Sequence, residues 1–325
     1  MGAREMTDMT VSGRRADPAV RRVRRGISPR GLWRYRYLYL LALPGIVYYL
    51  VFWYLPMVGI VIAFKNYTIT QGVFGSPWVG VQNFTDFFQS AYFWTLLRNT
   101  IVINVLKLVV GFPATIGFAL LLNEIGNRYF KRVIQTISYF PYFLSWVVAV
   151  LVFQDILSPD GALLPLLGHV GVPADVLDNE AWFYPIVVVT ALWKGYGYGA
   201  ILYLAAISAI DPQLYEAAMV DGAGRLRQAW NITLPSIRPI IVLLLVLNVG
   251  QLLNADFQQL LALLNGRPDL YDIGDVIDTY VYRFGLTHSE YSYAAAAGVF
   301  KGVISFVLVW AANRVAKRLG QEGLW

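Results

Sequence analysis

The stretch that decides the fold class is Tyr37–Phe64, YLYLLALPGIVYYLVFWYLPMVGIVIAF, which contains no charged side chain between Arg36 and Lys65. An α-helix rises about 1.5 Å per residue, so about 20 residues cross a hydrocarbon core about 30 Å thick. A helix also satisfies its own backbone polar groups where no water can do so. We therefore predict a membrane-spanning helix. A cleavable signal peptide would have a shorter apolar core followed by a small-residue cleavage site, so we expect this helix to be retained.

Five further apolar runs meet the same length criterion. The six predicted spans are residues 38–64, 99–122, 133–154, 183–208, 236–257 and 292–313. The fifth is the least regular, because polar side chains crowd its end. With 57% hydrophobic and 14% charged residues, the sequence predicts an all-α integral membrane protein. Its transmembrane domain is expected over 37–320, between tails at 1–36 and 321–325.

The composition excludes several classes of function. With no cysteine and two histidines, thiol catalysis, disulfides and Cys/His metal sites are not expected, and we predict no catalytic or metal-binding residues. The net charge of +6 does not indicate nucleic acid, because ten arginines are gathered in residues 1–36, directly before the first apolar run. We interpret that segment as a mostly disordered tail held near anionic lipid of the bilayer.

Lys and Arg are distributed unevenly between alternate loops. The segments before the first predicted span and after the second, fourth and sixth carry 19 of them, whereas the other loops carry Lys65, Arg267 and Arg283. The remaining four lie in or beside predicted helices: Arg98, Lys107, Lys194 and Lys301. Because cytoplasmic loops retain positive charge, both termini are expected in the cytoplasm. The aromatic segment 84–97, on the outer side in this topology, is predicted to be an interfacial helix.

A structured cytoplasmic loop is predicted between the fourth and fifth spans, at residues 211–235, DPQLYEAAMVDGAGRLRQAWNITLP. Asp211 before Pro212 is a helix-start signal, because the carboxylate can cap the helix and proline presets the first turn. Gly222 and Gly224 can end the helix after about ten residues. So short a helix is marginally stable alone, which indicates that a partner surface stabilises it.

The same loop resembles the EAA signature of ABC-importer permeases: Glu216-Ala217-Ala218, three residues, Gly222, nine residues, then Ile232-x-Leu234-Pro235. The resemblance implies a type I importer permease fold in which this loop forms a coupling helix seated in a groove of a cytoplasmic ATPase. The residues expected to make that contact are Leu214, Tyr215, Glu216, Ala217, Ala218, Asp221 and Gly222.

Softer matches extend the resemblance to the oligosaccharide and polysaccharide branch of the family, which includes maltose-type and alginate-type permeases. They are Leu43-Pro44-Gly45, Asn265-Gly266 and Ala311-Ala312-Asn313-Arg314. The resemblance implies a bacterial cytoplasmic membrane, a sugar substrate, a second permease subunit that is often a different chain, an ATP-binding cassette ATPase dimer and an extracytoplasmic solute-binding protein. The sequence contains no GxxxxGK[ST] phosphate loop, so no cofactor is expected in this chain, and ATP and Mg²⁺ are expected in the ATPase.

Polar side chains within spans are costly unless they face a cavity or a neighbour, so they are the candidates for a solute path. Amides, carboxylates and aromatic faces are the groups that hold sugars. The candidates at the fourth and fifth spans are Trp193, Lys194, Tyr196, Tyr198, Asn248, Asn254, Asp256 and Gln258. Helix packing and interhelical hydrogen bonds are alternative explanations. For Lys194, pairing within the protein, for example with Asp256, is favoured over pairing with an acidic sugar.

Two other classes of function are the alternatives to an importer permease. An ion-coupled secondary transporter of a small polar solute would be expected to show more spans, an internal repeat and membrane carboxylates. A membrane-embedded enzyme would need a clustered nucleophile or an acid-base set at one depth. Asp272, Asp275 and Asp278 could suggest a metal site, but their spacing favours one solvated external helix face.

Overall fold

The computed structural model describes residues 36–169 and 171–318, which fall into two compact units, one ending at Met57 and the other beginning at Val58. Each unit is described by itself. The predicted tails, 1–36 apart from Arg36 and 321–325, lie outside the described residues. Among the described residues, five helices are long and apolar enough to cross a membrane, and a bent helix pair makes a sixth candidate. No β-strand is assigned in this part of the chain.

The first predicted span is confirmed as a helical segment from Arg36 to Phe64. It begins as α2, Arg36–Tyr49, and continues as a π-helical stretch η1, Leu50–Tyr54, and a 3₁₀ stretch η2, Leu55–Phe64. Pro56 lacks the N–H that an α-helix would donate four residues back, which accounts for the change of helix type around it.

The segment that follows is short, looped and aromatic. It contains α3, Gly72–Gly75, and α4, Gln82–Gln89. The predicted interfacial helix at 84–97 is only partly correct, because the helix ends at Gln89 and α5 begins at Phe93. Phe87 and Phe93 are buried in a cluster with Phe300, so these rings pack against α16 within the protein.

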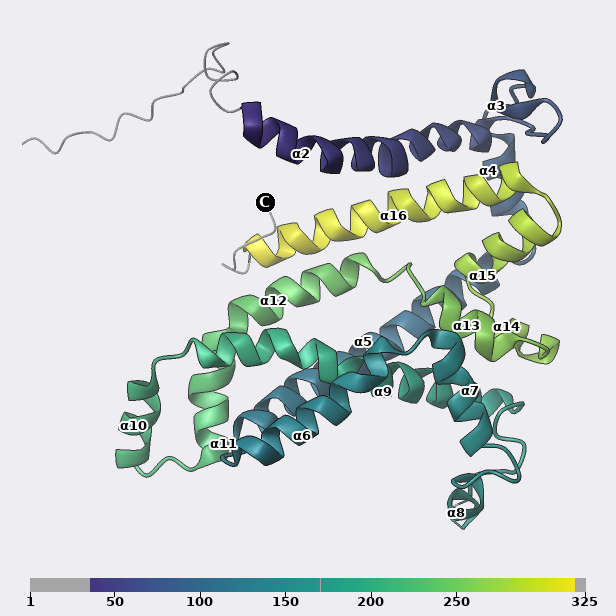
Figure 1. The fold of residues 1–325 in the computed structure, drawn as a ribbon. Coiled ribbons are helices and arrows are strands. Elements are labelled where there is room, and N and C mark those ends of the chain that lie inside the picture. The colour runs from purple at the N-terminus through teal and green to yellow at the C-terminus, as the bar shows by residue number, and fades with distance from the viewer. Residues whose placement is uncertain (1–35, 170, 319–325) are drawn as a thin grey trace, which may run out of the picture. The chain divides into compact units, whose positions relative to one another are not determined.

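Four long helices of the second unit position the candidate site. They are α5, Phe93–Asn123; α9, Glu180–Ser208; α12, Leu234–Gly250; and α16, Tyr291–Arg318. The predicted second, fourth and sixth spans are helical, as α5, α9 and α16. α5 and α9 run side by side, and α12 packs against both α9 and α16 (Figure 1). A core of Ala119, Ala200, Tyr203 and Ile237 joins the first three.

The fifth predicted span needs correction at both ends. α11, Arg225–Gln228, and the π-helical η4, Ala229–Thr233, lead directly into α12, so the apolar helix starts earlier than residue 236. It ends at Gly250, and residues 251–256 are non-helical before α13, Phe257–Leu264. Polar side chains in this link bond to one another, as Asn254 does to Gln251, which favours an irregular backbone over continued helix.

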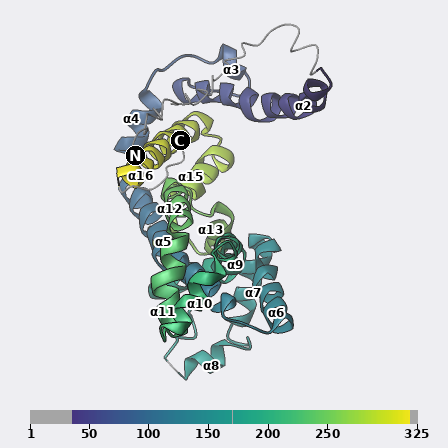
Figure 2. The same ribbon diagram turned by 90° about the vertical axis from the view of Figure 1, so that its left-hand side faces the viewer.

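The third predicted span is not a straight helix. α6, Arg128–Tyr139, is followed by the 3₁₀ turn η3, Phe140–Phe143, and by α7, Trp146–Ile156, with a bend of 108° between the two parts. Pro141 disrupts the first helix, and Ser145 caps the second by accepting a hydrogen bond from the Val148 N–H at 3.3 Å. Both parts lie beside α9 (Figures 1 and 2).

The remaining short elements are α8, Leu164–Gly168; η5, Pro268–Leu270; α14, Tyr271–Gly274; α15, Ile277–Tyr282; and the π-helical η6, Arg283–Thr287. The predicted solvated face of Asp272, Asp275 and Asp278 is wrong, because the helix breaks between α14 and α15. Asp275 is fully buried and bonds Thr279 and Arg283, and Asp278 is half-buried and pairs with Lys301.

The burial of Asp275 has an electrostatic consequence. Loss of water raises the pKa of its carboxyl, and the hydrogen bonds from Thr279 and Arg283 act against that rise. No cluster of three or more His, Cys, Asp or Glu side chains that could hold a metal ion occurs within the described ranges. The acidic side chains of this segment therefore tie α14 and α15 to their neighbours.

Candidate functional site

The predicted loop helix is α10, Pro212–Val220. The Asp211 side chain caps its start by accepting a hydrogen bond from the Gln213 N–H at 2.9 Å. At its end Gly222 adopts a left-handed φ of +76°, the Ala223 N–H bonds the Ala218 carbonyl at 2.8 Å, and the Gly222 N–H bonds the Met219 carbonyl at 3.1 Å. This is a Schellman cap, which favours glycine at the left-handed position. Both predicted helix signals are confirmed.

α10 has one face toward its own chain and one that is open. Leu214, Glu216, Ala217, Asp221 and Gly222 are exposed, whereas Tyr215 and Ala218 are half-buried. The Tyr215 hydroxyl hydrogen-bonds the Thr233 hydroxyl at 2.9 Å. The structure therefore leaves five of the seven predicted contact residues open to a partner and uses Tyr215 as an anchor.

The rest of the loop is held at the same end of the bundle. Gln228 donates a side-chain hydrogen bond to the Ala223 carbonyl at 2.8 Å, and Arg225 pairs with Glu124 at 3.5 Å. Glu124 directly follows α5, and Thr233 directly precedes α12. α10 and α11 lie beyond the ends of these helices (Figure 1), so the loop is joined to two long helices at once.

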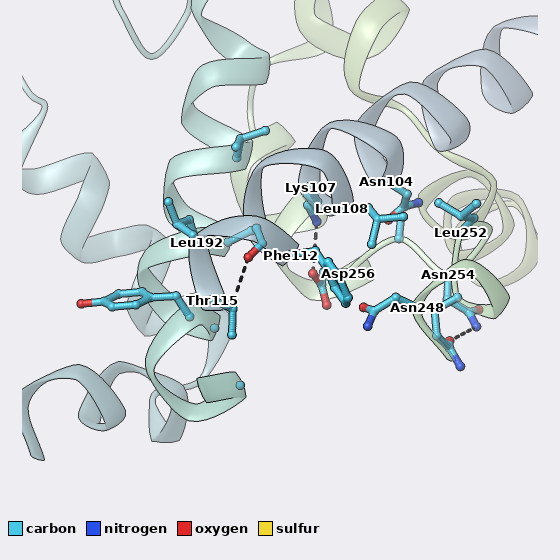
Figure 3. A pocket seen from close by; sticks show the side chains of 18 of the residues that line it. Asn104, Lys107, Leu108, Phe112, Thr115, Leu192, Asn248, Leu252, Asn254 and Asp256 are labelled. Carbon is cyan, nitrogen blue, oxygen red and sulfur yellow. Dashed lines mark hydrogen bonds and ion pairs between the residues drawn. The ribbon is translucent and has the colours of Figure 1, made fainter. Parts of the chain in front are cut away.

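A cavity of about 890 Å³ lies between α5, α9, α12 and the non-helical link 251–256. Its charged side chains are Lys107 from α5 and Asp256 from the link, which form an ion pair with Nζ to Oδ2 at 3.1 Å. Figure 3 shows the two side chains pointing toward each other, with Asn248 and Asn254 close by. The wall also carries the rings of Phe112, Trp146 and Tyr196.

The structure divides the eight residues predicted for the solute path. Five line the cavity: Tyr196, Asn248, Asn254, Asp256 and Gln258. Sequence reasoning gave no role to Lys107 and did not select Gln251 or Asn104, although all three line the same wall. The available signal was Lys107 itself, a lone charge inside the apolar run 99–122.

The other three residues serve the fold around the bend. The Lys194 ammonium donates to the carbonyls of Pro141 at 3.2 Å, Tyr142 at 2.8 Å, and Leu144. Tyr198 stacks on Tyr142 with ring centroids 3.8 Å apart. Trp193 packs edge-on against Phe153 at 5.2 Å. Lys194 thus pairs within the protein, as favoured, but with backbone carbonyls at the break in the helix. Of these, the Pro141 carbonyl also accepts a hydrogen bond from the Leu144 N–H at 3.2 Å.

The cavity offers amide donors and acceptors, aromatic faces and one ion pair, which suit a hydroxyl-rich solute. The open face of α10 and this cavity lie at two ends of one helix, α12, because Thr233 precedes that helix and Asn248 lies near its other end. One helix therefore joins the two candidate sites.

The comparisons with known proteins agree with this arrangement. The family described as "binding-protein-dependent transport system inner membrane component" matches residues 109–321. The polygalacturonan/rhamnogalacturonan transport system permease protein YteP of Bacillus subtilis is 46% identical over 292 residues, 89% of this chain and 90% of that protein. Protein LplB of the same species is 42% identical over 320 residues, 98% of this chain and 100% of that protein.

A solved structure agrees as well. A chain of a bacterial alginate ABC transporter, crystallised with an alginate pentasaccharide-bound periplasmic protein, superposes with a TM-score of 0.82 at 37% identity, over 91% of this chain and 99% of that chain. The resemblance inferred from the EAA loop is thereby confirmed, together with a multi-pass membrane protein of the importer-permease fold. This chain belongs to the family of binding-protein-dependent transport system inner membrane components, and it is a membrane permease subunit of that class.

Proposed function

We propose that this chain carries an oligosaccharide or polysaccharide inward across the bacterial cytoplasmic membrane as one of two permease subunits. Its partners are a second, different permease chain, an ATPase dimer that hydrolyses Mg²⁺-ATP, and an extracytoplasmic solute-binding protein. The observation that carries the proposal is the open face of α10, tied to the spanning helices through Tyr215 and Thr233. The names of the similar polygalacturonan and alginate proteins support a saccharide as solute.

The proposed orientation places α10 and both termini in the cytoplasm. Its support is the excess of Lys and Arg in the segments before the first span and after the second, fourth and sixth. In that orientation the exposed side chains of Leu214, Glu216 and Ala217 face the compartment that holds ATP. Ala217 allows a close approach of another surface, Leu214 adds apolar contact, and Glu216 adds a charge.

The coupling runs through contacts of the described chain. Displacement of α10 by an ATPase is transmitted by the Tyr215–Thr233 hydrogen bond to the start of α12. Asn248, near the other end of α12, lines the cavity. A movement driven by ATP hydrolysis thereby changes the wall that contacts the solute.

The test uses two α10 variants in the assembled transporter. Glu216→Lys reverses an exposed charge, and Gly222→Pro imposes a negative φ where the cap requires +76°. We expect both variants to insert in the membrane and to lose the bound ATPase or its solute-stimulated hydrolysis, measured by co-purification and phosphate release. Glu290→Lys, an exposed residue just before α16, is the matched charge control and is expected to behave as the parent.

Normal coupled hydrolysis in both α10 variants contradicts the proposal. Uptake that needs an ion gradient and proceeds with no ATPase bound would instead support a secondary transporter.

A further inference from the structure

The two partners of the ion pair in the cavity differ in exposure to water and in the backbone that carries them. Of the described residues that line it, Lys107 and Asp256 are the charged ones, and their side chains are 12% and 50% exposed. Lys107 lies within the continuous helix α5. Asp256 ends the non-helical link, directly precedes α13, and makes no side-chain cap hydrogen bond to that helix. The cation is therefore fixed and shielded, whereas the anion is half in water and on irregular backbone.

The neighbouring polar groups are neutral and already bonded. Asn104 donates to the Thr100 carbonyl at 2.8 Å, Asn248 donates to the Leu244 carbonyl at 2.7 Å, and Asn254 bonds Gln251. Outside the lining, the Lys194 ammonium also interacts electrostatically with Asp256 while donating to three carbonyls. Among the described residues, Asp256 is thus the carboxylate bonded to Lys107.

We propose that Lys107 determines specificity for a carboxylated saccharide and that the solute's carboxylate replaces Asp256 as the partner of the ammonium. This inference rests on the proposed saccharide import and adds the charge of the solute to it. A shielded ammonium needs a counterion at all times, because an unpaired charge within a membrane protein is costly. Exchange of one carboxylate for another keeps Lys107 paired, and Asp256 is already half-exposed, so its return to water costs little. A neutral sugar offers no replacement and leaves the resident pair intact.

The proposed exchange predicts that substitution of Lys107 and substitution of Asp256 change the preference for acid over ester differently. An ion pair that only stabilised the fold would show no such difference. The assembled transporter, with its ATPase and binding protein, is reconstituted in vesicles, and uptake of trigalacturonate is compared with uptake of its fully methyl-esterified form. Lys107→Gln is expected to raise the KM for the acid about tenfold relative to the ester, a loss equal to that of one modest ionic contact. Lys107→Arg keeps the charge and is expected to restore the preference for the acid. Asp256→Asn removes the competing carboxylate and is expected to keep or strengthen that preference.

The doubly substituted protein, Lys107→Asp with Asp256→Lys, retains an ion pair and guards against loss of folding in the single variants. It is expected to insert in the membrane and bind the ATPase like the parent, and to lose the preference for the acid over the ester. Equal losses for both solutes in Lys107→Gln and Asp256→Asn, or an unchanged acid-to-ester ratio in Lys107→Gln, overturn the exchange while leaving saccharide import intact. A parent that takes up neither solute nor any other saccharide overturns the proposed function itself.

A second measurement tests the inference if the solute-binding protein does not bind the methyl ester. The purified transporter is heated in detergent without the binding protein, and the midpoint of thermal unfolding is followed with excess trigalacturonate. We expect a rise in the parent and in Lys107→Arg and a smaller one in Lys107→Gln. The same rise in all three, or none in the parent, contradicts a carboxylate site at Lys107.

Discussion

Two membrane helices of this protein are interrupted, and the interruptions are closed in different ways. Between α6 and α7, the carbonyls of Pro141, Tyr142 and Leu144 accept hydrogen bonds from Lys194, and the Tyr142 ring stacks on Tyr198. Between α12 and α13, the polar side chains of residues 251–256 bond locally or to Lys107, and several of them line the cavity. The first interruption is closed by another helix and the second is open to the cavity.

The comparison shows that the role of a polar residue within a span depends on the partner to which it bonds. Lys194 and Lys107 have the same chemistry and both lie within apolar helices, yet one is bonded to backbone and the other to a side chain. The backbone carbonyls that bond Lys194 cannot be displaced by a solute. The half-exposed carboxylate of Asp256, on irregular backbone, can be displaced from Lys107. Substitution at the first interruption is therefore expected to change stability, and substitution at the second to change transport.

The largest expected effect is that of Lys194→Met. It removes the donor from the Tyr142 and Leu144 carbonyls, each at a cost of about 1–3 kcal/mol if water does not reach them, whereas the Pro141 carbonyl keeps the Leu144 N–H. We expect a lower midpoint of thermal unfolding and reduced membrane assembly, measured on the purified transporter. Lys107→Gln is the comparison variant, and its loss should be below about 1 kcal/mol, because the Asp256 left behind is half-exposed. Equal losses in the two variants would break the comparison.

Gly197→Ala is expected to come next. Gly197 of α9 lies against α6 so closely that a Cβ atom would stand 2.1 Å from the Ser138 carbonyl oxygen, so the backbones must separate. We expect a cost of about 1–3 kcal/mol, the range for overpacking in a tight core, again measured by thermal unfolding. Gly195→Ala is the control, because nothing lies within 4 Å of its Cβ position. A stable Gly197→Ala protein would show that the two helices can move apart freely.

Tyr198→Leu should have a smaller effect. It removes the ring stacked on Tyr142 and should cost about 0.5–1.5 kcal/mol beyond the area lost. Because Tyr198 does not line the cavity, the KM for the solute is expected to stay that of the parent. A changed KM without a change in stability would return Tyr198 to the solute path predicted from sequence.

The smallest change in stability is expected for Asn254→Ala. The residue is exposed, lies in the non-helical link and bonds only Gln251 through its side chain in the described chain, so the change should stay within about 0.5 kcal/mol. We expect saccharide uptake to fall nonetheless, with a KM raised several-fold. A clear loss of stability with unchanged uptake would mean that the second interruption is structural as well.

Local rules predicted much of the fold. Length and hydrophobicity locate the spans, and the caps of α10 depend on Asp211, Pro212 and Gly222, which lie within a few residues of the backbone groups that they satisfy. The bend in the third span was missed although Pro141 lies within the apolar run, because the donor that stabilises it, Lys194, is about 50 residues away. The end of α12 was missed because an apolar count does not see polar side chains bonding to one another in a link.

The site could be predicted only in part for a related reason. Residue type identified the polar candidates in spans four and five, but which of them face the cavity depends on how α5 packs against α9 and α12. Lys107 was left without a role because its partner, Asp256, lies on a segment predicted to be helix. The bond from Tyr215, a predicted ATPase contact, to Thr233 could not be predicted, because Thr233 lies 18 residues further along.

The hydrogen-bonded ends of α10 affect how much of a displacement this helix can transmit. Asp211 caps one end of the nine-residue helix Pro212–Val220, and the Schellman cap closes the other. Because neither terminal turn is frayed, a displacement of the helix is not lost through unwinding of its ends. We expect such a segment to move as a short rigid body, linked to the start of α12 by the Tyr215–Thr233 hydrogen bond. If α10 receives the proposed ATPase, loosening either cap is expected to let hydrolysis continue while less solute is delivered per nucleotide consumed.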